Sequence, residues 1–172
     1  MTSDQTEAIF ENASFIPKSN ESIKLDDLIE SKNHFKLFDF VLDNVDALLT
    51  KDMIIEKNKI LKRNTIDEEN PRYNVGGFKV VPNVIGVVNI INTADPDDFE
   101  EEIDALLNEY NSKTKIALDD IIDFHFKFER IHPFVDGNGP LGQQKTYLQK
   151  YLQNKVFTDF GKSFFLKKIL QF

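Results

Sequence analysis

Hydrophobic side chains recur at helical spacing along most of the first half of the chain. In residues 25–49 the apolar positions return every three or four residues, which predicts one helix, or two helices with a break near Asn33. The same spacing continues more briefly over residues 53–61, and residues 5–12 are a short helix candidate. These periodicities predict a mainly α-helical fold.

The pattern changes between residues 70 and 93, where β-branched and aromatic residues replace the helical spacing. Gly76 and Gly77 stand between such residues, which predicts a hairpin turn. Pro82 and Gly86 keep any strand short and close to an edge. A small β-hairpin is therefore expected within an otherwise helical chain.

Two further helices are expected before residue 132. Pro96 opens the first, whose apolar face consists of Phe99, Ile103, Leu106, Leu107 and Tyr110. In residues 117–131 apolar side chains cover most of the helix circumference, which is typical of a helix buried at the centre of an all-helical domain. This helix leads directly into His132. Another helix is expected after Gly139, with Pro140 in its first turn.

Length and composition indicate one soluble domain. A chain of 172 residues is long enough to bury a core of its own. It has no cysteine, which excludes disulfides and thiolate chemistry and fits a reducing, cytoplasmic setting. It shows no signal peptide and no uncharged apolar run long enough to span a membrane.

Charge is unevenly distributed along the chain. The net charge of −8 argues against a protein that grips the backbone of a nucleic acid, because such proteins need a positive stripe. Residues 143–172 hold six lysines and one aspartate, a net charge of +5, which leaves −13 for residues 1–142. Residues 143–172 are therefore expected to form an atypical basic, helical C-terminal tail. This tail would be a terminal packing segment or a helix for a membrane surface or a partner.

The stretch HPFVDGNG, residues 132–139, joins two predicted helices and carries the candidate chemistry. Glycines on both sides of Asn138 let successive backbone N–H groups turn inward, and the next helix directs its positive end to the same place. Such an arrangement of N–H groups is an anion-binding site, and phosphate is the anion that it most commonly binds. Asp136 would repel a bare anion, and Mg²⁺ resolves the conflict by bridging carboxylate and phosphate oxygens.

His132 lies at the other end of this loop and is a candidate general base, because the pKa of histidine is close to neutrality. Phe134 is expected to point into the core. A base, a metal-binding carboxylate and a phosphate cradle within eight residues predict transfer of a phosphorus-containing group to a hydroxyl. The competing interpretation is a structural histidine followed by a common turn sequence.

These residues resemble the signature of Fic (Fido) domain proteins, His-x-Phe-x-(Asp/Glu)-Gly-Asn-Gly-Arg-x-x-Arg. The resemblance runs over about residues 25–142 and includes residues 72–91, which look like the β-hairpin flap of that family. It implies a helical bundle with a small flap. It also implies transfer of AMP from ATP to a Ser, Thr or Tyr hydroxyl of a target protein, with no nucleic acid involved.

Carried over residue by residue, the resemblance implies a role for each loop position. His132 would deprotonate the target hydroxyl, and Asp136 would hold Mg²⁺ between the α- and β-phosphates of ATP. The phosphates would be cradled by Gly137, Asn138 and Gly139. The flap would bind the target segment by strand addition. The flap residues concerned are Gly76, Gly77, Phe78, Lys79 and Val80.

The chain departs from the signature where the family has its two arginines. Pro140 and Gln143 occupy these positions, and neither supplies the charged fork with which arginine binds phosphate. Losing two charged contacts costs roughly 3 to 6 kcal/mol of nucleotide or transition-state binding. This corresponds to a loss of about two to four orders of magnitude in rate. The alternative function is therefore a catalytically inactive Fic-fold pseudoenzyme or a protein-binding module.

Residues 1–24 are expected to form an N-terminal segment that carries a candidate inhibitory helix. Many Fic proteins carry (Ser/Thr)-x-x-x-Glu-(Gly/Asn), whose glutamate pairs with the second signature arginine. Here Glu11 precedes Asn12, but residue 7 is glutamate and Thr6 is one place off. An ordinary amphipathic start to the domain is the alternative interpretation.

Overall fold

A computed structural model describes residues 3–12, 14–15, 22–44, 46–85 and 91–138 of the chain. Its helices are α1 (Ser3–Asn12), α2 (Leu25–Asp43), α3 (Lys51–Lys62), α4 (Ile66–Glu69), α5 (Phe99–Asn111) and α6 (Leu118–Ile131). Two short antiparallel strands, β1 (Val84–Ile85) and β2 (Ile91–Asn92), pair Val84 with Asn92 and Ile85 with Ile91. The fold is mainly α-helical, as the periodicity predicts.

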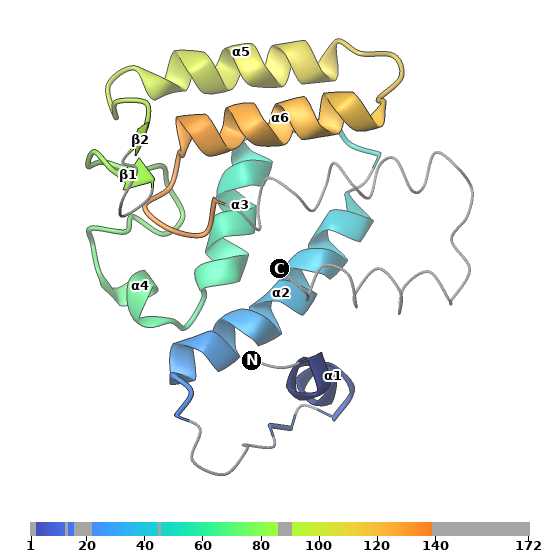
Figure 1. Cartoon of the computed structure of the whole chain (residues 1–172), viewed down its shortest axis with the longest axis vertical. Coiled ribbons are helices and arrows are strands. Elements are labelled where there is room, and N and C mark those ends of the chain that lie inside the picture. Colours follow the sequence, from blue (N-terminus) through green and yellow to red (C-terminus); the bar gives the residue numbers. More distant parts are fainter. Residues whose placement is uncertain (1–2, 13, 16–21, 45, 86–90, 139–172) are drawn as a thin grey trace.

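The helices form two packed pairs, shown in Figure 1. Helices α5 and α6 lie antiparallel, and α2 packs against α3 at the other side of the core, with α1 beside α2. The short strands and α4 lie on the side toward which the chain turns when it leaves α6. None of the helices in the described ranges is long and apolar enough to cross a membrane.

The core lies where the two pairs meet. All five residues of the predicted apolar face of α5 are buried. Tyr110 packs against Phe124 of α6, with 4.8 Å between the ring centroids. Leu37 and Leu61 contribute from α2 and α3, and Phe134 is buried just beyond α6, as predicted.

Helix α2 runs without a break through Asn33, so the single-helix interpretation is confirmed over residues 25–43. Asn33 is buried, and its side-chain amide donates to the carbonyl oxygens of Leu61 (3.0 Å) and Arg63 (2.7 Å) at the end of α3. A polar side chain inside the helix therefore joins α2 to α3, and the helix stays intact around it.

The prediction of a hairpin turn at Gly76 and Gly77 was wrong. These glycines lie in a local turn, where Gly77 N donates to Asn74 O at 2.9 Å and Gly76 has a φ of 89°. The chain then runs inward at Lys79, whose backbone N–H donates to Pro133 O in the loop after α6, and no strand of the described residues flanks this turn. The observed strands begin eight residues later, and the residues that connect them lie outside the described part of the chain.

Helix α6 is buried on one side only, which corrects the prediction of a helix buried all round. Phe128 is 1% exposed, whereas Phe126 is 75% exposed and Ile122 is 46% exposed. The reason is that α5 and the core cover only part of its circumference. The predicted helix after Gly139 and the tail of residues 143–172 lie outside the described residues.

Candidate functional site

His132 lies at the point where α6 ends. Its backbone adopts the left-handed conformation, with φ 51° and ψ 61°, and its N–H donates to Phe128 O at 2.9 Å. This conformation is unfavourable for a residue with a Cβ and persists only where surrounding contacts impose it. It turns the chain sharply out of the helix, so that the loop of residues 132–138 folds back toward α3 (Figure 1).

The His132 ring has a defined hydrogen bond that fixes its tautomer. Nδ1 lies 3.2 Å from the carbonyl oxygen of Glu129, and a carbonyl can only accept, so Nδ1 carries the hydrogen. The lone pair of the neutral ring is then on Nε2. Burial lowers the pKa of His132; the Glu129 carbonyl and the Asp136 charge oppose this shift, and the Lys79 charge adds to it. His132 is therefore neutral at pH 7 and able to accept a proton.

The side chain of Glu129 lies beside the same ring. Its Oε2 is 3.9 Å from His132 Nδ1, and its Oε1 is buried without a hydrogen-bond partner. Burial raises the pKa of the Glu129 carboxyl. Glu129 was not predicted as a site residue, although its position three residues before His132 on a helix places it on the same face.

The loop after α6 is held through its own carbonyl oxygens. Three of them accept hydrogen bonds from residues outside the loop: Pro133 from Lys79 N (2.8 Å), Phe134 from Asn83 (2.8 Å) and Asp136 from Asn58 (3.3 Å). The carbonyl oxygen of Ile131, the last residue of α6, accepts from Lys79 Nζ (3.2 Å). These bonds attach the loop to α3 and to the chain around residues 79–83.

Lys79 donates hydrogen bonds to the end of α6 and to the loop that follows it, although the resemblance assigns this residue to the target-binding flap. Its side chain is buried, and its ammonium also donates to Asn83 Oδ1 (2.9 Å) and Thr93 Oγ1 (2.8 Å). Burial lowers the pKa of Lys79 to about 8, against the charges of Asp95 and Glu102. In this structure the Lys79 side chain is therefore not open at the surface.

The other predicted flap residues differ in exposure. Gly76 and Val80 are exposed, whereas Gly77 and Phe78 are partly buried. Phe78 packs against Phe99 and Phe134, with ring centroids 5.3 and 5.5 Å apart. Only part of the predicted flap surface is therefore open to a target.

Asn138 closes the loop on itself. Its side-chain oxygen accepts from Phe134 N at 2.9 Å, and its side-chain nitrogen donates to Phe134 O at 2.8 Å. The side chain is buried and both of its polar groups are used, so only its backbone remains for a phosphate.

Gly137 satisfies a steric requirement at the same turn. Its φ is 84°, and an added Cβ would lie 3.0 Å from Leu61 Cδ2. Glycine is therefore required for the loop to pass this close to α3. Gly139, the third member of the predicted phosphate cradle, lies outside the described residues, as do Pro140 and Gln143.

Asp136 is bound by a lysine that the sequence analysis missed. The Asp136 side chain is 60% exposed, and its Oδ2 accepts a hydrogen bond from the ammonium of Lys62 at the end of α3. Lys62 also pairs with Glu30 of α2 at 2.6 Å and with Asp67 of α4 at 2.9 Å. No signal in the sequence connects these residues, because 74 positions separate Lys62 from Asp136.

The electrostatics keep Asp136 ionised. Burial raises the pKa of the Asp136 carboxyl, but the hydrogen bond and charge of Lys62, with smaller contributions from Gly137 and His132, together outweigh this and hold the pKa below its ordinary value. Burial likewise opposes the charge on Lys62, but hydrogen bonds to its three carboxylate partners hold the pKa of Lys62 above its ordinary value. An ionised, exposed carboxylate is the oxygen ligand that Mg²⁺ prefers, so Asp136 fits the predicted metal role.

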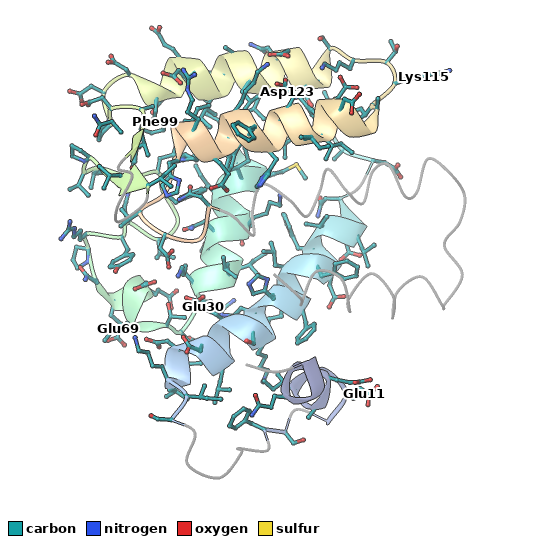
Figure 2. The ribbon with its side chains drawn as sticks, viewed as in Figure 1. Glu11, Glu30, Glu69, Phe99, Lys115 and Asp123 are labelled. Atoms are coloured by element: carbon teal, nitrogen blue, oxygen red, sulfur yellow. The ribbon has the colours of Figure 1, made fainter. Side chains whose placement is uncertain are left out.

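Glu11, the candidate inhibitory residue, is exposed on α1. Helix α1 packs against α2, and Figure 2 shows Glu11 pointing outward from it. The described structure therefore does not bring Glu11 to the loop that carries His132.

Comparison with protein families decides the identity of the fold. The Fic/DOC family profile matches residues 48–143, which is more than half of the chain. The chain belongs to the Fic/DOC family. The matched region contains His132, Asp136 and Lys62, whereas Glu30 of α2 lies outside it. No curated protein matches the chain.

Solved structures of Fic proteins share the fold. One is a Fic domain-containing signalling protein from Bacteroides thetaiotaomicron VPI-5482, with a TM-score of 0.75 and 21% identity over 99% of this chain. A Fic family protein from Desulfovibrio desulfuricans G20 has a TM-score of 0.72 and 20% sequence identity over 91% of this chain. Fic-1 (residues 134–508) from C. elegans has a TM-score of 0.56 and 19% sequence identity over 87% of this chain. The chain spans 65%, 44% and 44% of these three structures.

Proposed function

We propose that the chain is a Mg²⁺-dependent protein adenylyltransferase that transfers AMP from ATP to a hydroxyl side chain of a target protein. The observation that carries the proposal is the state of His132. This histidine is neutral, presents Nε2 as the free base, and lies on the same fixed loop as an ionised, exposed carboxylate. Membership of a family that includes AMPylating enzymes supports the same reaction.

The reaction assigns one task to each group. His132 Nε2 accepts the proton of the target hydroxyl while the hydroxyl oxygen attacks the α-phosphorus of ATP. The bond from this phosphorus to the bridging oxygen breaks, and pyrophosphate leaves. Asp136 would hold Mg²⁺, which supplies positive charge to the polyphosphate. Lys79 and Asn83 keep the loop, and with it His132, in place.

The target segment is proposed to bind at the short β-ladder. A two-stranded ladder leaves unpaired backbone groups along its outer edges, and an extended peptide can add to such an edge as a further strand. Exposed Val84 lies on β1, and exposed Val80 precedes it. These residues would contact the target in place of the buried Lys79.

A second function is favoured by specific departures from the signature. Pro140 and Gln143 replace both arginines, and Lys62 already binds Asp136. Together they support a pseudoenzyme that keeps the fold and binds a protein partner without transferring a nucleotide.

The decisive experiment uses ATP labelled at the α-phosphate, Mg²⁺ and a cell lysate as a source of targets. The first prediction is that the Pro140→Arg/Gln143→Arg variant transfers label about 100-fold faster than the natural chain or more, because two charged phosphate contacts are restored. Adding His132→Ala to this variant abolishes transfer.

Each outcome distinguishes the two functions. Label transfer by the natural chain establishes the adenylyltransferase. Transfer by the arginine variant alone, dependent on His132, shows that the natural chain is a disabled enzyme. The proposal fails if neither protein transfers label, or if transfer survives His132→Ala.

A further inference from the structure

Lys62 lies among three carboxylates that come from three different parts of the fold. Glu30 belongs to α2, Asp67 to α4 and Asp136 to the loop after α6. The Lys62 side chain is only 2% exposed, so its ammonium cannot rely on water and depends on these partners. Figure 2 shows Glu30 on α2, beside α3 and α4, where the cluster lies. We call these four residues the lysine cluster.

An ammonium group has three N–H donors, and each carboxylate of the lysine cluster takes one. Lys62 therefore competes directly with any cation for Asp136 Oδ2. The three carboxylates offer oxygens within 4.8 Å of one another, a spacing that suits a metal ion, but the ammonium already lies among them. The lysine cluster carries a net charge of −2, so it keeps an attraction for a further cation.

We propose that Lys62 is a built-in competitor of the divalent cation at Asp136, and that it sets the cation affinity of the motif aspartate. This inference rests on the proposed role of Asp136 as the metal ligand. When a cation takes Asp136, the ammonium stays paired with Glu30 and Asp67, so its release does not leave a buried charge without a partner. The exchange links the loop to α2 and α4, the elements that keep Lys62 when it leaves Asp136.

The test is the binding of Mn²⁺ without nucleotide, measured by calorimetry and by the electron paramagnetic resonance signal of free Mn²⁺. Lys62→Met removes the competitor and is expected to tighten binding about tenfold or more. Lys62→Met/Glu30→Gln removes one positive and one negative charge, so the cluster stays at −2. Tighter binding in this double variant reports removal of the competitor and not a change in total charge.

Three controls complete the design. Lys59→Met removes an exposed lysine of the same helix and is expected to leave the affinity unchanged. Glu30→Gln alone leaves the ammonium with fewer negatively charged partners, so it holds Asp136 more tightly and Mn²⁺ binding is expected to weaken. Asp136→Asn, added to either Lys62 variant, is expected to abolish the gain.

The inference is overturned if folded Lys62→Met and the double variant bind Mn²⁺ no more tightly than the natural chain. It is also overturned if the gain survives Asp136→Asn, because the ion would then bind elsewhere. If Lys62→Met does not fold, the double variant, which leaves fewer carboxylates without a partner, gives the answer. These measurements involve no nucleotide. The competition between Lys62 and the cation can therefore be confirmed even if AMP transfer is not observed, and AMP transfer can be observed even if the competition is not.

Discussion

At the scale of single residues, a buried lysine adds to the effect of burial on the candidate base and lowers the pKa of His132 further. Lys79 is buried, bonds only to neutral oxygens and lies 6.0 Å from the centre of the Phe99 ring. Its positive charge disfavours a proton on His132, and its hydrogen bond to Ile131 O holds the end of α6. A residue that the resemblance places in the target-binding flap is therefore buried beside the end of α6.

Replacing Lys79 is expected to raise the pKa of His132. Lys79, with a pKa of about 8, is protonated where His132 titrates, so the natural chain has a positive charge beside the ring in that range. Lys79→Met removes this charge and makes the protonated ring less unfavourable. The pKa is measured from the ring signals of His132 in an NMR titration.

A matched control for this titration is Lys51→Met. Lys51 pairs with Glu100 and Asp104, two residues of α5, and contributes nothing to the pKa of His132. The pKa of His132 is expected to stay the same in this variant. An unchanged or lower pKa in Lys79→Met would show that the lysine does not act on the base.

At the scale of elements, α6 has a buried face and an exposed one, and the two bear similar residues. Phe124 and Phe128 stack in the core with ring centroids 6.0 Å apart. Phe126, two residues from each, lines a surface groove of about 650 Å³ between α5 and α6. Hydrophobicity alone does not separate these faces; the position of α5 and the core does.

The two faces predict opposite results for the same substitution. Phe128→Ala is expected to lower the free energy of unfolding by about 3 to 5 kcal/mol, because it leaves a cavity in the core. Phe126→Ala is expected to change it by no more than about 0.5 kcal/mol, because the ring is already in water. Urea denaturation of both variants measures the difference. Similar losses would mean that the exposed face of α6 is covered in solution.

At the scale of the whole molecule, the loop after α6 is the point where the two helix pairs meet. It leaves α6, and Asp136 bonds to Lys62 of α3, which in turn binds α2 and α4. The same ion pairs that surround the candidate metal ligand therefore also tie the fold together. Acid is expected to weaken this connection.

Asp136→Asn is expected to reduce the acid sensitivity of the fold. Because the pKa of Asp136 is lower in the folded chain, its contribution to stability is present above the ordinary aspartate pKa and is lost as pH falls below it. The variant should melt at a lower temperature at pH 7 and lose less stability toward pH 3. Melting temperatures across this range measure both effects.

Asp39→Asn, a change at an exposed aspartate of α2, is the matched control for the acid series. It should keep the melting temperature and the acid slope of the natural chain. Equal acid slopes for Asp136→Asn and the natural chain would contradict a stabilising bond between Asp136 and Lys62.

The sequence by itself determined the helices and the motif. Helical spacing placed α2, α3, α5 and α6, and the run from His132 to Gly139 pointed to the family and the candidate base, because both are local properties of neighbouring residues. Only the tertiary structure decided which face of α6 is buried, where the strands pair, and which groups hold the motif. Lys62 reaches Asp136 of the motif from 74 positions away, and Lys79 reaches Ile131, directly before the motif, from 52 positions away. No local pattern encodes a contact over such a separation.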